Sequence, residues 1–127
     1  MNHRKRNESW SDDELCASVD AYLYMLRLEV PSIPYSPTKY TKFLQTGPLR
    51  DRNDASIRYG MRNISQVMEE RGAPILRSFS PAAQVGRNVK KKINELLNAR
   101  LMPPAVPKER RVELSDILVR LDELKIS

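Results

Sequence analysis

The sequence predicts an all-α protein, a compact bundle of about four helices with one more helix after a proline-rich linker. Two observations lead to this prediction. Apolar residues recur every three or four positions in several stretches, which is the period of a helix with one buried face. Residue types that start helices precede those stretches, and Gly or Pro follows them. A chain of 127 residues accommodates one domain, or one domain with an appendage.

The first helix has signals at both ends. Ser11 is a good N-cap, and Glu14, three residues later, completes a capping box. The apolar stripe that follows continues to about Glu29, and the helix must end before Pro31. We expect Trp10 to pack back on this helix as a core anchor.

A short second helix follows a proline-rich loop at residues 30–37. Ser36 and Pro37 read as a cap and a first helical residue, and the helix runs to about Gln45. Gly47-Pro48 then stops it.

The central stretch, residues 53–72, predicts a helix with two different faces. Asn53 or Asp54 can cap it, and Gly72 ends it. Gly60 lies in its middle and costs about 1 kcal/mol relative to Ala. Close approach of another backbone, from protein or from ligand, is one reason for a glycine there. An apolar stripe for the core is formed by Ile57, Met61, Ile64 and Met68.

The remaining segments complete the domain plan. A fourth helix is expected from Pro81, with Ser80 as its cap, to Leu101, and its first half carries a basic cluster. Residues 1–9 form a flexible basic arm, 10–101 the helical domain, 102–110 a proline-rich linker and 111–127 a C-terminal amphipathic helix. The last helix has an apolar seam of Leu114, Ile117, Leu118, Leu121 and Leu124.

The charge of the chain is compatible with a polyanionic partner, and no motif in it looks like an active site. The net charge is +6, and residues 39–107 contain thirteen Lys and Arg against five Asp and Glu, a local excess of +8. A single cysteine, Cys16, allows no intramolecular disulfide and suits the reducing cytoplasm. The one histidine, His3, leaves no metal-ligand cluster. We therefore expect no enzyme activity, no cofactor, no metal and no membrane span.

The helix order resembles a helix-turn-helix, in which two helices brace a third that enters the major groove of double-stranded DNA. Arg bonds guanine, and Asn or Gln bonds adenine, in bidentate fashion. The residues expected to read base edges are Ser56, Tyr59, Arg62, Asn63 and Gln66. Those expected to bind phosphates are Arg50, Arg52, Arg58, Arg87, Lys90, Lys91 and Lys92. A minor-groove arm is expected from Arg4, Lys5 and Arg6.

Two runs carry a family resemblance: RNDASIRYGMRNISQVMEERG, then SFSPAAQVGRNV. They are similar to the module found N-terminal to HNH nuclease domains in bacterial modification-dependent restriction endonucleases. WSDDEL and its apolar stripe are also loosely similar to Myb/SANT-type three-helix domains. The resemblance implies a DNA-targeting module of bacterial defence, associated with the nucleoid, with the sensing of modified bases as a further expectation. It also implies a nuclease domain C-terminal to this chain.

Three alternatives remain open on the sequence alone. The basic middle of the chain is also typical of a solvated surface that binds nothing. A protein-interaction or oligomerisation module would use the seam of residues 114–124, for example to form a homodimer. An RNA-binding regulator ranks lower, because aromatic residues that could stack on unpaired bases are few, with Tyr59 the main one.

Overall fold

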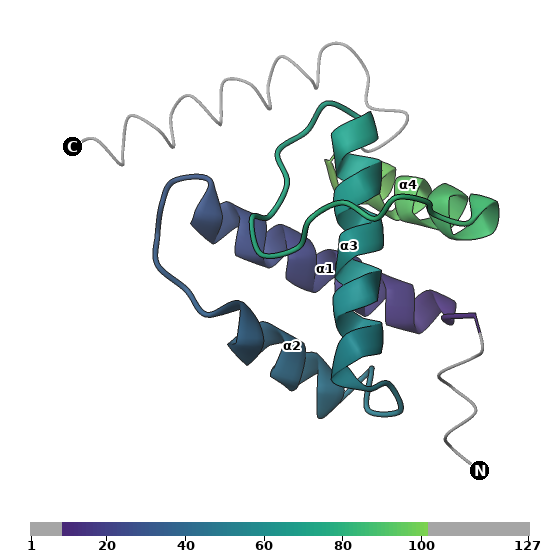
Figure 1. The fold of residues 1–127 in the computed structure, drawn as a ribbon, viewed down its shortest axis with the longest axis horizontal. Helices are drawn as coiled ribbons and strands as arrows, with labels where there is room; N and C mark the ends of the chain where they lie inside the picture. The colour runs from purple at the N-terminus through teal and green to yellow at the C-terminus, as the bar shows by residue number, and fades with distance from the viewer. Residues whose placement is uncertain (1–8, 102–127) are drawn as a thin grey trace. The chain divides into compact units, whose positions relative to one another are not determined.

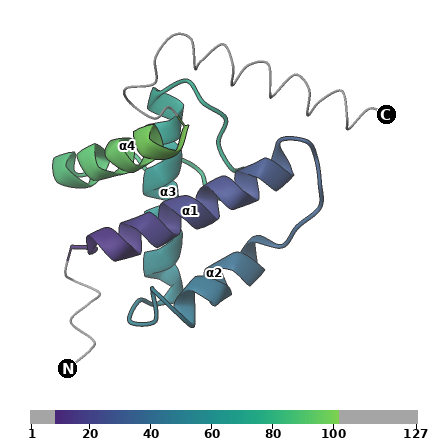
Figure 2. The same ribbon diagram turned by 180° about the vertical axis from the view of Figure 1, so that it is seen from behind.

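Four helices form the part of the chain that the computed structural model describes, residues 9–101, and no strand occurs in it. They are α1 (Asp12–Glu29), α2 (Pro37–Gln45), α3 (Asp54–Glu70) and α4 (Arg87–Leu101). The chain divides into two units, Met1–Leu97 and Asn98–Ser127, and only the last turn of α4 is described in the second. In the first unit α1 and α2 lie side by side, and α3 crosses both (Figures 1 and 2).

The helix ends follow from the capping residues. The Ser11 hydroxyl accepts a hydrogen bond from the Glu14 amide at 3.2 Å, and the Glu14 carboxylate accepts one from the Ser11 amide at 2.8 Å, which confirms the capping box. Asn53 caps α3 by accepting from the Ser56 amide at 2.8 Å. After α3, Gly72 takes a φ of +72°, a conformation that glycine adopts without strain.

The core lies where α1 and α3 cross, and a buried polar network centred on Tyr22 runs through it. The Tyr22 hydroxyl lies 2.7 Å from the Ser65 hydroxyl and accepts a hydrogen bond from the Leu76 amide at 3.0 Å. Burial raises the pKa of Tyr22, so the phenol stays neutral in the folded protein. These bonds tie α1, α3 and the segment after α3 together. The expected stripe of α3 is buried throughout, at Ile57, Met61, Ile64 and Met68.

The expectation for the start of the fourth helix was wrong. The helix begins at Arg87, six residues later than Pro81, and Gly86 accepts its first hydrogen bond, from the Lys90 amide. The physical reason is a tertiary contact: the Ala82 amide donates to the Arg62 carbonyl of α3 at 3.1 Å. Ala82 and Phe79 are buried, so this segment packs on α3 instead of coiling.

Candidate nucleic-acid interface

The N-terminal half of α3 presents an open polar strip. Ala55, Arg58 and Tyr59 are exposed, with 52% of Tyr59 accessible. Ser56 is half-buried, and its amide is used by the Asn53 cap. The opposite side of the same turns is buried in the core, so the helix is held rigidly while this strip is exposed among the described residues.

The segment after α3 bounds this strip. It crosses in front of the helix at its middle (Figure 1), where Arg62 Nε donates to the Ser80 carbonyl at 3.0 Å. The guanidinium of Arg58 lies over the Phe79 ring, 5.4 Å from its centroid. Residues 79–82 therefore form one wall, and they hold Arg62 and Arg58 in defined positions.

Beyond the crossing, α3 is less suited to a polyanion. Gln66 Nε2 donates to the Glu70 carboxylate at 3.0 Å, and Lys90 Nζ does so at 3.1 Å. These two bonds lower the pKa of Glu70, which keeps a negative charge there. Asn63 is half-buried, and its Oδ1 accepts no hydrogen bond within the described part of the chain. Of the five expected base readers, Asn63 and Gln66 are thus the worst placed.

Arg52 requires a correction, because it cannot contact phosphates in this arrangement. Its side chain is 0% exposed and forms an ion pair with Glu14, with Nη2–Oε1 at 2.8 Å and Nε–Oε2 at 2.9 Å. It also donates to the Ser9 carbonyl at 3.3 Å and lies 5.1 Å from the Trp10 ring centroid. Arg52 is a core residue. Its neighbour Arg50 is exposed, and Nη1 of that side chain donates to the nearby Gly47 carbonyl at 3.2 Å.

Gly60 has a structural role that the sequence did not reveal. A Cβ at this position would lie 2.5 Å from Cη2 of Trp10, closer than side chains tolerate. The glycine lets the indole ring lie directly on α3, so Trp10 anchors to the third helix and to Arg52 as well as to the core. The same ring lines a cavity of about 320 Å³ together with Asn88 and Lys91 of α4.

The basic cluster of α4 is divided between free and paired residues. Arg87 and Lys91 are exposed. Lys90 pairs with Glu70 at 3.1 Å, and Lys92 pairs with Asp12 at 2.8 Å. Such surface pairs are weak and can exchange for a phosphate. Lys91 lines a cavity together with Trp10, and the ring of Trp10 also lies on Gly60 of α3.

Three expectations fall outside the described residues. They are the basic arm of Arg4, Lys5 and Arg6, the proline-rich linker at 102–110, and the C-terminal helix at 111–127 with its seam at 114–124. Ser9, the first described residue, accepts a hydrogen bond from the buried Arg52 at its carbonyl. Asp54 and Ala55 are exposed residues in the first turn of α3 that the predicted site did not include. Ala55 precedes Tyr59 by four positions, and residues four apart share one face of a helix, so this spacing could have predicted its exposure.

Within residues 9–101, no group of three or more His, Cys, Asp or Glu side chains could hold a metal ion. None of the described helices has the length and apolar character to cross a membrane. Comparison of the chain with protein-family models, curated proteins and solved structures finds no match.

Proposed function

We propose that this protein is a non-catalytic double-stranded DNA-binding protein that places the N-terminal half of α3 in the major groove. The observation that best supports this proposal is the exposed strip of Ala55, Arg58 and Tyr59 on a helix whose other side is buried. In helix-turn-helix proteins, the N-terminal residues of the recognition helix are the ones that contact base edges. The strip offers residue types suited to base contacts, namely a guanidinium, a phenol and a methyl group that fits a thymine methyl.

The structure leads us to revise the roles of individual residues. Ser56, Tyr59 and Arg62 remain the base-reading candidates, and Arg58 joins them because it projects from the same strip. Asn63 and Gln66 move to the edge of the contact, since they lie at or past the crossing segment. The phosphate contacts are assigned to Arg50, Arg87 and Lys91, with Lys90 and Lys92 recruited from their surface ion pairs.

The proposed docking differs in one respect from a typical helix-turn-helix. The connection between α2 and α3 has eight residues, 46–53, where three or four are usual. Leu49, fully buried, and the Gln45 side chain, which donates to the Arg52 carbonyl at 3.1 Å, hold this longer turn against the core. Arg50 is thereby carried on a rigid turn directly before α3.

In a wider setting, we propose a targeting module of bacterial restriction or defence that acts in the cytoplasm at the nucleoid. Two features support this: the similarity of residues 52–72 and 78–89 to modules preceding HNH nuclease domains, and the basic middle of the chain. The reading of modified bases and the presence of a nuclease partner are parts of this proposal.

Duplex binding measured by fluorescence anisotropy at about 50 mM and 200 mM salt tests it. Binding should weaken steeply with salt, with a log–log slope of about 0.9 for each phosphate neutralised. Arg58→Ala should weaken binding about tenfold, as expected for a lost contact of about 1–3 kcal/mol. The matched control is Arg27→Ala, which removes the same charge from an exposed site in the last turn of α1.

The control should change affinity much less than Arg58→Ala. The proposal fails if the chain does not bind duplex DNA at low salt, or binds with no salt dependence. Equal losses for Arg27→Ala and Arg58→Ala would reject α3 as the reading element, while leaving non-specific DNA binding in place.

A further inference from the structure

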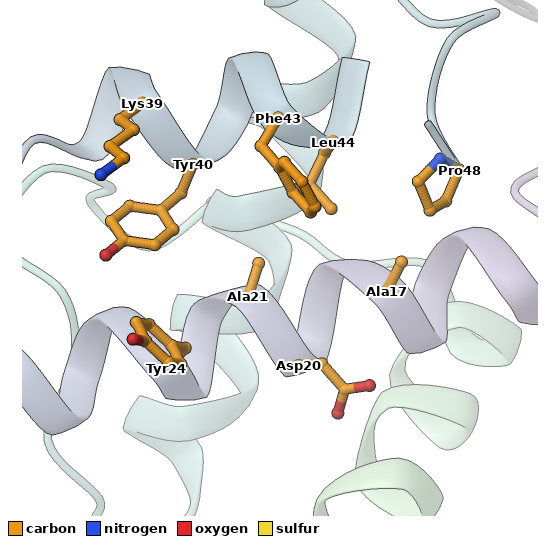
Figure 3. Close-up of a pocket in the computed structure, with 9 residues that line it drawn as sticks. All are labelled: Ala17, Asp20, Ala21, Tyr24, Lys39, Tyr40, Phe43, Leu44 and Pro48. Atoms are coloured by element: carbon orange, nitrogen blue, oxygen red, sulfur yellow. The ribbon is translucent and has the colours of Figure 1, made fainter. Parts of the chain in front are cut away.

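An apolar groove runs between α1 and α2, and the proposed DNA contact does not use it. Its volume is about 610 Å³. Figure 3 shows side chains from the two helices facing one another across it, with Pro48 at one end. The residues that line it are Ala17, Asp20, Ala21, Tyr24, Lys39, Tyr40, Phe43, Leu44 and Pro48.

The groove has a small-residue side and an aromatic side. Ala17 and Ala21 lie one turn apart on α1 and leave room for an incoming side chain. Tyr40 packs its ring 5.5 Å from that of Tyr24, so this end is ordered by an aromatic pair. Phe43 is 71% exposed, the most exposed large hydrophobic residue in the described part of the chain. An apolar surface of this kind, rich in aromatics, is typical of an interaction site.

The charges that line the groove indicate which kind of molecule can bind in it. One acid, Asp20 on α1, and one base, Lys39 on α2, lie on opposite sides of the groove, so the face is electrically neutral. Nucleic acid has no reason to bind there. The chain as a whole carries +6, so two copies repel each other at long range, and a contact on a neutral face adds the least local repulsion. The groove is such a face.

We propose that the α1–α2 groove binds a second copy of this chain across a two-fold axis. An isologous contact requires one surface patch to be complementary to itself. This patch has both halves of the contact: an exposed Phe43 and a small-residue recess, with Asp20 and Lys39 on opposite sides. A two-fold axis that sets α1 of one copy against α2 of the other places Asp20 and Lys39 of different copies on facing helices.

The size of the face sets the strength of the dimer. With 18 residues, α1 is about 27 Å long, α2 with nine residues is about 14 Å long, and each is about 10 Å wide. The face therefore offers about 400 Å² per copy, or about 800 Å² in the pair, which is the size of a weak, transient interface. The dimer is accordingly concentration-dependent. Phe43, which projects into the groove, is its main anchor.

Sedimentation velocity of the full chain without DNA, at up to about 0.5 mM, tests the proposal independently of the proposed function. The wild type should dimerise, and Phe43→Glu should raise the dimer Kd about tenfold or more. Tyr59→Glu is the matched control, because it makes the same exchange at an exposed aromatic of α3 and should leave the dimer unchanged. Lys39→Glu, a second exposed site in the groove, should raise the Kd a few-fold.

A third variant, Leu118→Glu, separates this groove from the leucine seam, and it should keep the dimer. Circular dichroism checks that each variant is folded. A wild type that stays monomeric overturns the proposal, as does a dimer that is insensitive to Phe43→Glu. Loss of the dimer in Leu118→Glu or in Tyr59→Glu also overturns it, because the contact then lies elsewhere.

Discussion

Two arginines on either side of the start of α3 show how differently one residue type is used in this protein. Arg52 and Arg58 each lie near an aromatic ring, 5.1 Å from Trp10 and 5.4 Å from Phe79. Arg52 is sealed in the core by the Glu14 carboxylate, whereas Arg58 projects from the open strip. The first holds α1, the turn and the N-terminus of the domain together. The second is available to a ligand.

This difference shows that counting basic residues in a sequence overestimates how many of them are exposed to a nucleic acid. Among the seven residues expected to bind phosphates, one is buried and two form surface ion pairs. We call the buried surroundings of Arg52, with Glu14 and Trp10, the sealed region, and the exposed strip of α3 with the start of α4 the open region. We expect substitutions in the sealed region to change the free energy of unfolding and substitutions in the open region to change the affinity for DNA.

The largest effect is expected for Glu14→Ala, in the sealed region. It leaves the buried Arg52 charge without its carboxylate, which should cost about 3–5 kcal/mol of unfolding free energy. Chemical denaturation followed by circular dichroism measures this. Asp13→Ala, an exposed acid in the same helical turn, should cost less than about 1 kcal/mol. A double Glu14→Met, Arg52→Met variant should recover part of the loss, because no buried charge then remains unpaired.

Similar losses for Glu14→Ala and Asp13→Ala would show that the ion pair contributes little. The difference between the sealed and open arginines would then be one of exposure alone.

A smaller effect is expected for Gly60→Ala, where the sealed region touches α3. The new methyl group would meet the rigid Trp10 ring at 2.5 Å. Overpacking costs about 1–3 kcal/mol, and the better helix propensity of Ala offsets up to about 1 kcal/mol of it. Thermal unfolding measures the net loss. Gly47→Ala serves as control, because the added Cβ makes only an ordinary contact at 3.8 Å. A Gly60→Ala variant as stable as the wild type would mean that Trp10 moves aside easily.

The smallest effects are expected in the open region, and they concern binding. Arg62→Ala should lower the affinity for a preferred duplex and relax the sequence preference, while Lys91→Ala should weaken binding to all duplexes alike. The Lys91 change should also reduce the salt slope by about one. Anisotropy titrations with several unrelated duplexes measure both. Identical behaviour of the two variants would remove Arg62 from the base-reading set and leave it as a residue that positions the segment at Ser80.

Much of the helical framework follows from local sequence. The capping box of Ser11 and Glu14 and the Pro37 start were readable, because each depends on residues within one turn, and the sequence narrowed the cap of α3 to Asn53 or Asp54. The start of α4 could not be read from local sequence. Ser80-Pro81 has the pattern of a helix start, but the Ala82 amide donates a hydrogen bond to the Arg62 carbonyl of α3. Local signals cannot indicate a competing partner that lies so far away in the chain.

By itself, the sequence determined the all-α class, the bounds of α1 and α2, the buried stripe of α3 and the basic middle of the chain. Periodicity and capping are short-range effects, so they can be read without the fold. Only the tertiary structure decided that Glu14 neutralises Arg52, that Trp10 requires Gly60, and that the segment 79–82 limits the free strip of α3 to its first half. These facts join residues up to 50 positions apart, and burial and electrostatics act through space without regard to sequence separation.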